Sequence, residues 1–123
     1  GPSLHILVVD DEEPILNLVE AILASDGHRV DTAASGQAAL DLIARHRYQV
    51  VISDWKMPGL NGMQVHEDLL AKDPAMARRM LFMTGDVVND TFQEFLKKHG
   101  RTCLPKPFSL REFRAAVSAL AKE

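Results

Sequence analysis

The sequence has a single cysteine, Cys103, in 123 residues. One cysteine excludes an internal disulfide and a cysteine-rich zinc site, and it fits a reducing setting, so we expect a cytoplasmic protein. Long apolar runs are also missing. The longest ones, such as residues 6–9 and 50–52, are far shorter than the ~20 residues needed to cross a bilayer. We therefore expect no signal peptide and no membrane insertion.

Basic residues are outnumbered, with 14 Lys and Arg against 17 Asp and Glu and a net charge of −3. The charges are spread along the chain and leave no extended basic stripe for DNA phosphates, so direct nucleic-acid binding is not expected. The length and the 46% hydrophobic content suit one compact domain. Residues 1–3, Gly-Pro-Ser, look like a tag remnant, which leaves residues 4–123 as the domain.

Short apolar runs alternate with segments of helical periodicity along the chain. Residues 4–9 are rich in β-branched side chains and stop at acidic residues, as expected of a strand buried on both faces. Further strands are predicted at 29–33, 48–53, 80–84 and 102–104. Helices are predicted from Pro14 to about residue 25, over 38–47 and 63–72, from residue 92 to Gly100, and after Ser109, which forms a capping box with Glu112. The pattern predicts an α/β fold, (βα)5, with a parallel five-stranded sheet.

Polar residues follow the predicted strands at their carboxyl ends. The five residues are Asp10, Asp11, Asp54, Thr84 and Lys106. They would share one edge of the sheet, which is where such sheets bind ligands. Three carboxylates placed together repel one another unless a cation compensates, and carboxylate and carbonyl oxygens suit Mg²⁺. A lysine and a hydroxyl beside the ion would cover the oxygens of a phosphoryl group while Asp54 attacks it.

These residues resemble the signature of response-regulator receiver domains in two-component signalling, over essentially the whole chain. The matching motifs are Asp10-Asp11, Asp54-Trp55-Lys56-Met57-Pro58 with Gly62, Met83-Thr84-Gly85 and Lys106-Pro107-Phe108. The resemblance implies a doubly wound, flavodoxin-like sheet with strand order 2-1-3-4-5. Residues 84–108 look most like receivers fused to the C-terminus of a hybrid histidine kinase.

The resemblance also implies roles for the acidic residues. Asp54 would be the phosphorylated residue. Asp11, Asp54 and the backbone carbonyl of Lys56 would bind Mg²⁺ (or Mn²⁺) directly, and Asp10 would position the ion partly through water.

Thr84 would be the switch hydroxyl and Lys106 the phosphate-binding lysine, followed by a cis peptide bond to Pro107. The implied function is a phosphoacceptor in a phosphorelay, which catalyses its own phosphorylation and dephosphorylation without being a conventional turnover enzyme. The implied partner is a histidine kinase or a histidine phosphotransfer domain, with fused effector or kinase domains as further partners.

Three positions depart from the receiver pattern and are candidate modulators. Cys103 stands where many receivers have an aromatic residue, so we expect the backbone of 84–88 to report phosphorylation instead. We hypothesise that Lys56 and Asp86 form a salt bridge across the mouth of the pocket. Trp55 is expected to be partly exposed. The histidines lack metal-ligand spacing and are expected at the surface or at strand edges; they are His5, His28, His46, His66 and His99.

Three alternatives stay open on the sequence alone. A haloacid-dehalogenase phosphatase would want an Asp-x-Asp pair after the first strand and a cap domain, whereas Asp10 and Asp11 are adjacent. A flavodoxin-like cofactor binder would want a Ser/Thr/Gly-rich loop there, and residues 10–13 would repel its phosphate. A binding module could keep the fold without phosphorylation.

Overall fold

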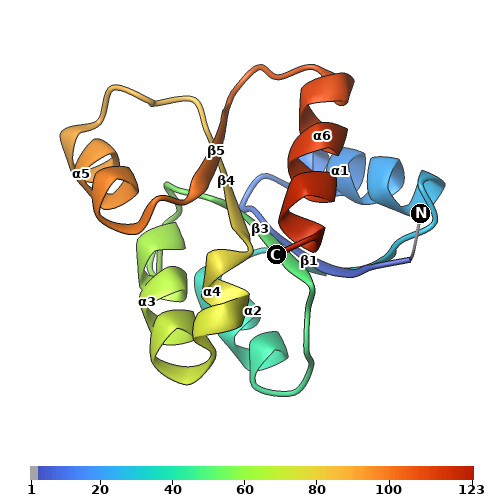
Figure 1. The fold of residues 1–123 in the computed structure, drawn as a ribbon, viewed down its shortest axis with the longest axis horizontal. Helices are drawn as coiled ribbons and strands as arrows, with labels where there is room; N and C mark the ends of the chain where they lie inside the picture. Colours follow the sequence, from blue (N-terminus) through green and yellow to red (C-terminus); the bar gives the residue numbers. More distant parts are fainter. Residues whose placement is uncertain (1–2) are drawn as a thin grey trace.

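The computed structural model describes residues 3–123 and contains one five-stranded sheet (Figure 1). Apart from Ser3, the predicted tag remnant lies outside the described residues. The strands are β1 (His5–Val9), β2 (Arg29–Ala33), β3 (Val50–Asp54), β4 (Met80–Thr84) and β5 (Thr102–Pro105). They are parallel throughout and lie in the order β2-β1-β3-β4-β5, which confirms the predicted fold class and strand order.

Six helices, all within residues 3–123, cover the sheet. They are α1 (Glu13–Ser25), α2 (Gly36–Ile43), α3 (Gly62–Lys72), α4 (Pro74–Arg78), α5 (Asp90–His99) and α6 (Leu110–Ala121). In Figure 1, α1 and α6 lie on one side of the sheet, and α2, α3 and α4 lie on the other. No helix within residues 3–123 has the length and apolar content that a membrane crossing requires.

Alternate residues of the central strands point into two separate cores. Ile6 and Val8 of β1 pack with α1 and α6, whereas Leu7 and Val9 pack with the helices on the opposite face. Every residue of β3 is buried. Burial on both faces is the reason that these strands read as unbroken apolar runs rather than as alternating patterns.

Apart from shifts of one or two residues at other ends, three differences from the predicted elements stand out. The sequence did not predict α4, because Asp73-Pro74 was interpreted as the end of the preceding helix. Pro74 instead begins a new helical turn, in which the Asp73 side chain accepts a hydrogen bond from the Met76 amide. The predicted helix over 38–47 ends at Ile43, and β3 begins at Val50 rather than at residue 48.

Candidate functional site

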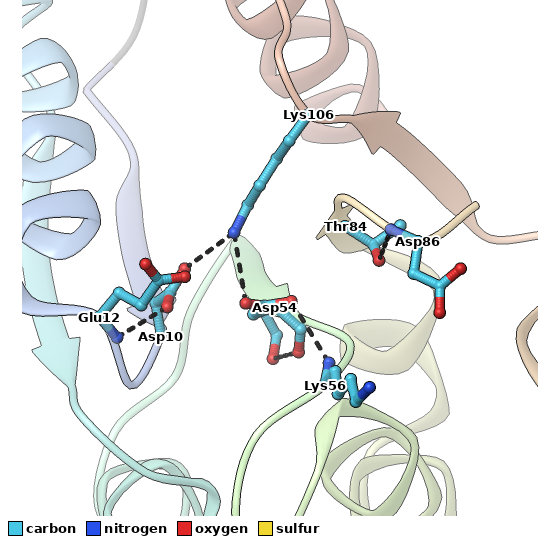
Figure 2. Close-up of polar contacts among 8 residues, drawn as sticks. Asp10, Glu12, Asp54, Lys56, Thr84, Asp86 and Lys106 are labelled. Carbon is cyan, nitrogen blue, oxygen red and sulfur yellow. Dashed lines mark hydrogen bonds and ion pairs between the residues drawn. The ribbon is translucent and has the colours of Figure 1, made fainter. Parts of the chain in front are cut away.

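Four polar residues meet at the carboxyl edge of the sheet, each from a different strand end (Figure 2). Asp10 directly follows β1, Asp54 and Thr84 are the last residues of β3 and β4, and Lys106 follows β5. Asp10, Asp54 and Thr84 are buried, and the Lys106 side chain reaches to Asp10 and Asp54. The carboxyl ends of neighbouring parallel strands lie side by side. The pairing of β1, β3, β4 and β5 therefore brings together residues that are far apart in the sequence.

Lys106 contacts both carboxylates. Its Nζ lies 3.3 Å from Oδ2 of Asp54 and 3.5 Å from Oδ2 of Asp10. The backbone amide of Lys106 donates a 2.7 Å hydrogen bond to the carbonyl of Thr84, and the peptide bond to Pro107 is cis. Burial by itself would lower the pKa of Lys106, but the charges of Asp54 and Asp10 outweigh burial and raise it. The lysine is therefore a fixed positive charge at this edge.

Asp10 has one carboxylate oxygen that makes no hydrogen bond and only the longer ion pair with Lys106. Its Oδ1 accepts a 2.9 Å hydrogen bond from the Glu12 amide, whereas its buried Oδ2 accepts no hydrogen bond from residues 3–123. Burial raises the pKa of Asp10, and the charge of Asp54 adds to this rise, although the Glu12 amide and Lys106 oppose it. A buried carboxylate oxygen that accepts no hydrogen bond is the kind of atom that a hard divalent cation satisfies.

The carboxylates that lie close enough to share one cation are those of Asp10, Glu12 and Asp54, with one oxygen of each within 4.8 Å of the others. This set includes Glu12, which was not among the residues that the sequence predicted for the site. Asp11, in contrast, is exposed and lies outside this set. The direction of the chain after β1 decides which of the consecutive acids turns inward, and no residue type signals that choice.

The loop after Asp54 folds back closely on the site. The Lys56 amide lies 3.3 Å from Oδ1 of Asp54 and donates to it, and the Gly62 amide donates a 3.0 Å hydrogen bond to the carbonyl of Trp55. A Cβ on Gly62 would lie 2.6 Å from the Asp54 carbonyl oxygen. Glycine is therefore required at this position for the loop to approach β3.

The hypothesised salt bridge between Lys56 and Asp86 is wrong for this structure. Lys56 is exposed, and the described residues include no ion pair between its ammonium and the Asp86 carboxylate (Figure 2). Asp86 contributes its backbone instead, because its amide donates a 3.0 Å hydrogen bond to the Thr84 hydroxyl. The Thr84 hydroxyl proton stays free to donate to a ligand.

The expected exposure of Trp55 is also wrong. Its indole is buried and packs against the rings of Phe92, Phe95 and Phe82, with centroids 4.6, 4.9 and 5.6 Å away. Helix α5 supplies two of these rings and covers the loop. Because α5 is about forty positions further along the chain, local sequence around Trp55 does not reveal this cover.

Two further side chains lie on the same side of the sheet. Cys103 is half-buried against the core beneath α2 to α5, and burial raises the pKa of its thiol. His66 is fully buried, in contrast to the expectation that all histidines lie at the surface or at strand edges.

The fold and this site together define a phosphoacceptor signalling domain of the receiver class. A family model described as the response regulator receiver domain matches residues 6–118. The chain therefore belongs to the response regulator receiver family, the phosphoacceptor modules of two-component signalling. The phosphatase and flavodoxin-type alternatives gain no support.

Two relatives and one solved structure illustrate the similarity. The chain is 32% identical to Sporulation initiation phosphotransferase F of Bacillus subtilis, over 91% of this chain and 89% of that protein. It is 36% identical to Virulence sensor protein BvgS of Bordetella bronchiseptica, in a match that covers 97% of this chain and 10% of that protein. The receiver domain of sensor histidine kinase PA1611 from Pseudomonas aeruginosa, solved with a magnesium ion in its active site cleft, superposes with a TM-score of 0.85 at 26% identity, covering 99% and 100% of the two chains.

Proposed function

We propose that Asp54 is the residue of this receiver that accepts a phosphoryl group, donated by the phosphohistidine of a histidine kinase or of a histidine phosphotransfer domain. The observation that carries the proposal is the contact of the Lys106 ammonium with both Asp54 and Asp10 at a buried edge that holds an excess of negative charge. The single cysteine fits the reducing cytoplasm as the place of this reaction.

Mg²⁺ is the proposed cofactor, with Mn²⁺ as a substitute of similar ligand preference. Oδ2 of Asp10, which accepts no hydrogen bond, and the carboxylates of Asp54 and Glu12 fit a hard divalent ion. The Lys56 carbonyl and the exposed Asp11 are the further ligands that the family resemblance implies. When bound, the ion neutralises the repulsion between the carboxylates and the incoming phosphoryl group.

The protein's own residues account for the transfer step. An oxygen of Asp54 forms a bond to phosphorus while the bond from phosphorus to the donor imidazole nitrogen breaks in line. Lys106 Nζ donates hydrogen bonds to the transferred phosphoryl oxygens, and the free proton of the Thr84 hydroxyl is available for another. Hydrolysis by water later returns Asp54 to its carboxylate form.

Transmission of the signal is proposed to run through the backbone of residues 84–88. The half-buried thiol of Cys103 has no ring that could change between buried and exposed rotamers. When Thr84 turns toward a phosphoryl group, its hydrogen bond from the Asp86 amide changes, and the following loop carries Val88, which is 80% exposed. Phosphorylation then shifts the population of two loop states that kinase, phosphotransfer or fused effector domains can distinguish.

The test is intact-mass measurement after incubation with acetyl phosphate and Mg²⁺. We expect the wild type to gain the mass of one phosphoryl group and Asp54→Asn to gain none, with unchanged circular dichroism. Chelation by EDTA should prevent the gain, and Mn²⁺ should restore it. Labelling that persists in Asp54→Asn would refute Asp54 as the acceptor. A purified phosphohistidine domain used in place of acetyl phosphate tests the proposed class of donor.

A further inference from the structure

A second cluster of metal-ligand atoms lies away from the phosphorylation site, between α3 and the end of α5. It consists of His66 and Glu67 of α3 and His99, the last residue of α5. The Glu67 Oε1 atom lies 3.6 Å from Nδ1 of His66 and 3.6 Å from Nε2 of His99. The two imidazole rings lie side by side in a tilted arrangement, with centroids 4.6 Å apart and planes inclined by 59°.

His66 supplies the second, independent observation. Its side chain is fully buried, and its Nδ1 has no hydrogen-bond partner among the described residues although it is directed into the cluster. A buried polar nitrogen without a partner costs about 1–3 kcal/mol. Native proteins rarely keep such an atom unless a ligand or an ion satisfies it.

The protonation state of His66 suits a metal ligand. Burial, together with the charges of Arg101 and His99, lowers the pKa of His66 to about 4, although Glu67 opposes this shift. The ring is therefore neutral at pH 7, which is the form that binds metal ions. The neutral form of the His66 ring thus follows from its burial and from the neighbouring charges, whether or not an ion is bound.

The donor set indicates the class of ion. Two imidazole nitrogens with one carboxylate oxygen form a ligand set of three-ligand zinc centres, which keep a fourth position for water. Bonds of about 2.0–2.2 Å in tetrahedral geometry separate ligand atoms by roughly 3.4 Å. The two 3.6 Å separations here are close to that value. Glu67 has 53% of its side chain exposed, so solvent reaches the cluster from the Glu67 side.

We propose that His66 Nδ1, Glu67 and His99 Nε2 bind a divalent transition-metal ion of the zinc class, at a site separate from the phosphoacceptor edge. Such an ion ties α3 to the C-terminal end of α5. His66 also packs on Phe95, with ring centroids 4.7 Å apart. Phe95 in turn packs on Trp55, the residue that follows Asp54 in the chain. The proposed ion therefore borders the aromatic cluster beneath the phosphorylation loop.

Arg101 controls whether His66 Nδ1 can bind the ion. The Arg101 Nε–H donates a 2.9 Å hydrogen bond to His66 Nε2, so the proton of the neutral ring is on Nδ1. Metal binding removes that proton to solvent, and Nε2 takes one up from solvent, so no net proton is released. Arg101 then loses its acceptor on the ring but keeps the hydrogen bond that its Nη1 donates to the His99 carbonyl. Arg101 therefore opposes metal binding, and its removal should strengthen it.

The test is isothermal titration of the full chain with Zn²⁺, with Mg²⁺ present in excess to occupy the carboxylate edge. We expect one equivalent of Zn²⁺ to bind, and His99→Gln and Glu67→Gln to weaken binding at least about tenfold, since even outer-shell changes cost that much. His46→Gln, at an exposed histidine outside the cluster, is the matched control and should bind as the wild type does. Glu67 has 53% of its side chain exposed and His99 has 11%, whereas His66 is fully buried, so the substitutions are made at Glu67 and His99, and circular dichroism verifies that both variants fold.

Two further variants make the result decisive. Arg101→Gln should tighten Zn²⁺ binding by about tenfold, because metal binding then no longer breaks the hydrogen bond between the charged Arg101 guanidinium and His66 Nε2. Asp54→Asn should leave Zn²⁺ binding unchanged, so the outcome does not depend on the phosphoacceptor function. Co²⁺ should give the visible absorption bands of a tetrahedral site in the wild type but not in His99→Gln. Binding that persists equally in His99→Gln and Glu67→Gln, or that is lost in Asp54→Asn, would overturn the proposal.

Discussion

Lys106 and Asp54 are 52 positions apart in the sequence, and yet the Lys106 ammonium lies 3.3 Å from the Asp54 carboxylate. The same ammonium lies 3.5 Å from Asp10. One positive charge thus faces a cluster of three carboxylates, so the edge of the sheet carries a surplus of negative charge. The folded protein keeps this repulsion because the site is built for ligands rather than for stability.

The first prediction concerns Asp10. Because its folded-state pKa lies above the ordinary 3.8, the folded protein binds more protons than the unfolded chain above that pH. The contribution of Asp10 to stability therefore falls as pH rises from 3.8 through the folded pKa. Asp10→Asn should raise the free energy of unfolding at pH 7 by about 1–2 kcal/mol in EDTA. Urea denaturation between pH 4 and 8 measures this.

Asp11→Asn is the control for that experiment, since Asp11 is exposed. It should leave the pH dependence in EDTA unchanged. Equal stabilisation by the two substitutions would mean that burial of Asp10 is not the cause.

The second prediction concerns Gly62. Helix propensity alone would favour alanine by up to about 1 kcal/mol at this first position of α3. A Cβ there would lie 2.6 Å from the Asp54 carbonyl and 3.1 Å from the Phe82 ring, so Gly62→Ala should instead destabilise the fold by about 1–3 kcal/mol. Gly85→Ala is the matched control, because a Cβ at Gly85 meets nothing within 4 Å. Thermal melts of both variants decide between propensity and clash.

The third prediction concerns the polar network of Asp31. The Tyr48 hydroxyl donates a 2.7 Å hydrogen bond to Asp31, and His5 lies 3.0 Å from the same oxygen. Burial alone would raise the pKa of Asp31, but these hydrogen bonds outweigh it and lower the pKa below 3.8. The stabilisation is therefore present above pH 3.8 and is lost as pH falls through the lower folded-state pKa.

Tyr48→Phe should accordingly cost about 1–2 kcal/mol at pH 7 and less at pH 2. Urea denaturation at both pH values provides the comparison. In an Asp31→Asn background the cost at pH 7 should shrink as well. A cost that is independent of both pH and Asp31 would show that packing, rather than the hydrogen bond, is lost.

The fourth prediction tests the burial of Trp55, which is the only tryptophan. Acrylamide should quench its fluorescence poorly in the folded state and strongly in urea. Phe95→Ala removes a ring 4.9 Å from the indole and should cost about 3–5 kcal/mol while increasing quenching. Leu18→Ala, on the exposed face of α1, should change stability by less than about 0.5 kcal/mol. Strong quenching in the folded wild type would contradict the packing described.

The sequence by itself determined the alternation of strands and helices and the residue type at each strand end. Both properties are local: burial on two faces selects continuous apolar runs such as Val50 to Ile52, and the polar residue that follows marks where the strand leaves the core. Asp54, Thr84 and Lys106 could therefore be assigned to one edge before the structure was known. The sequence predicted the boundaries of α2 and β3 less accurately, and it did not predict α4. The same residue types begin a turn and a short helix, as Asp73-Pro74 does.

Only the tertiary structure decided which side chains meet across elements. It placed Glu12 rather than Asp11 beside Asp10, left Lys56 and Asp86 apart, covered Trp55 with α5, and buried His66 beside His99. The choice between Glu12 and Asp11 depends on the direction of the chain after β1. The other three outcomes depend on how two segments distant in sequence pack, and a local pattern carries no information about the partner's position or direction. The residues that supply the chemistry can thus be identified from the chain, whereas their environment follows from packing alone.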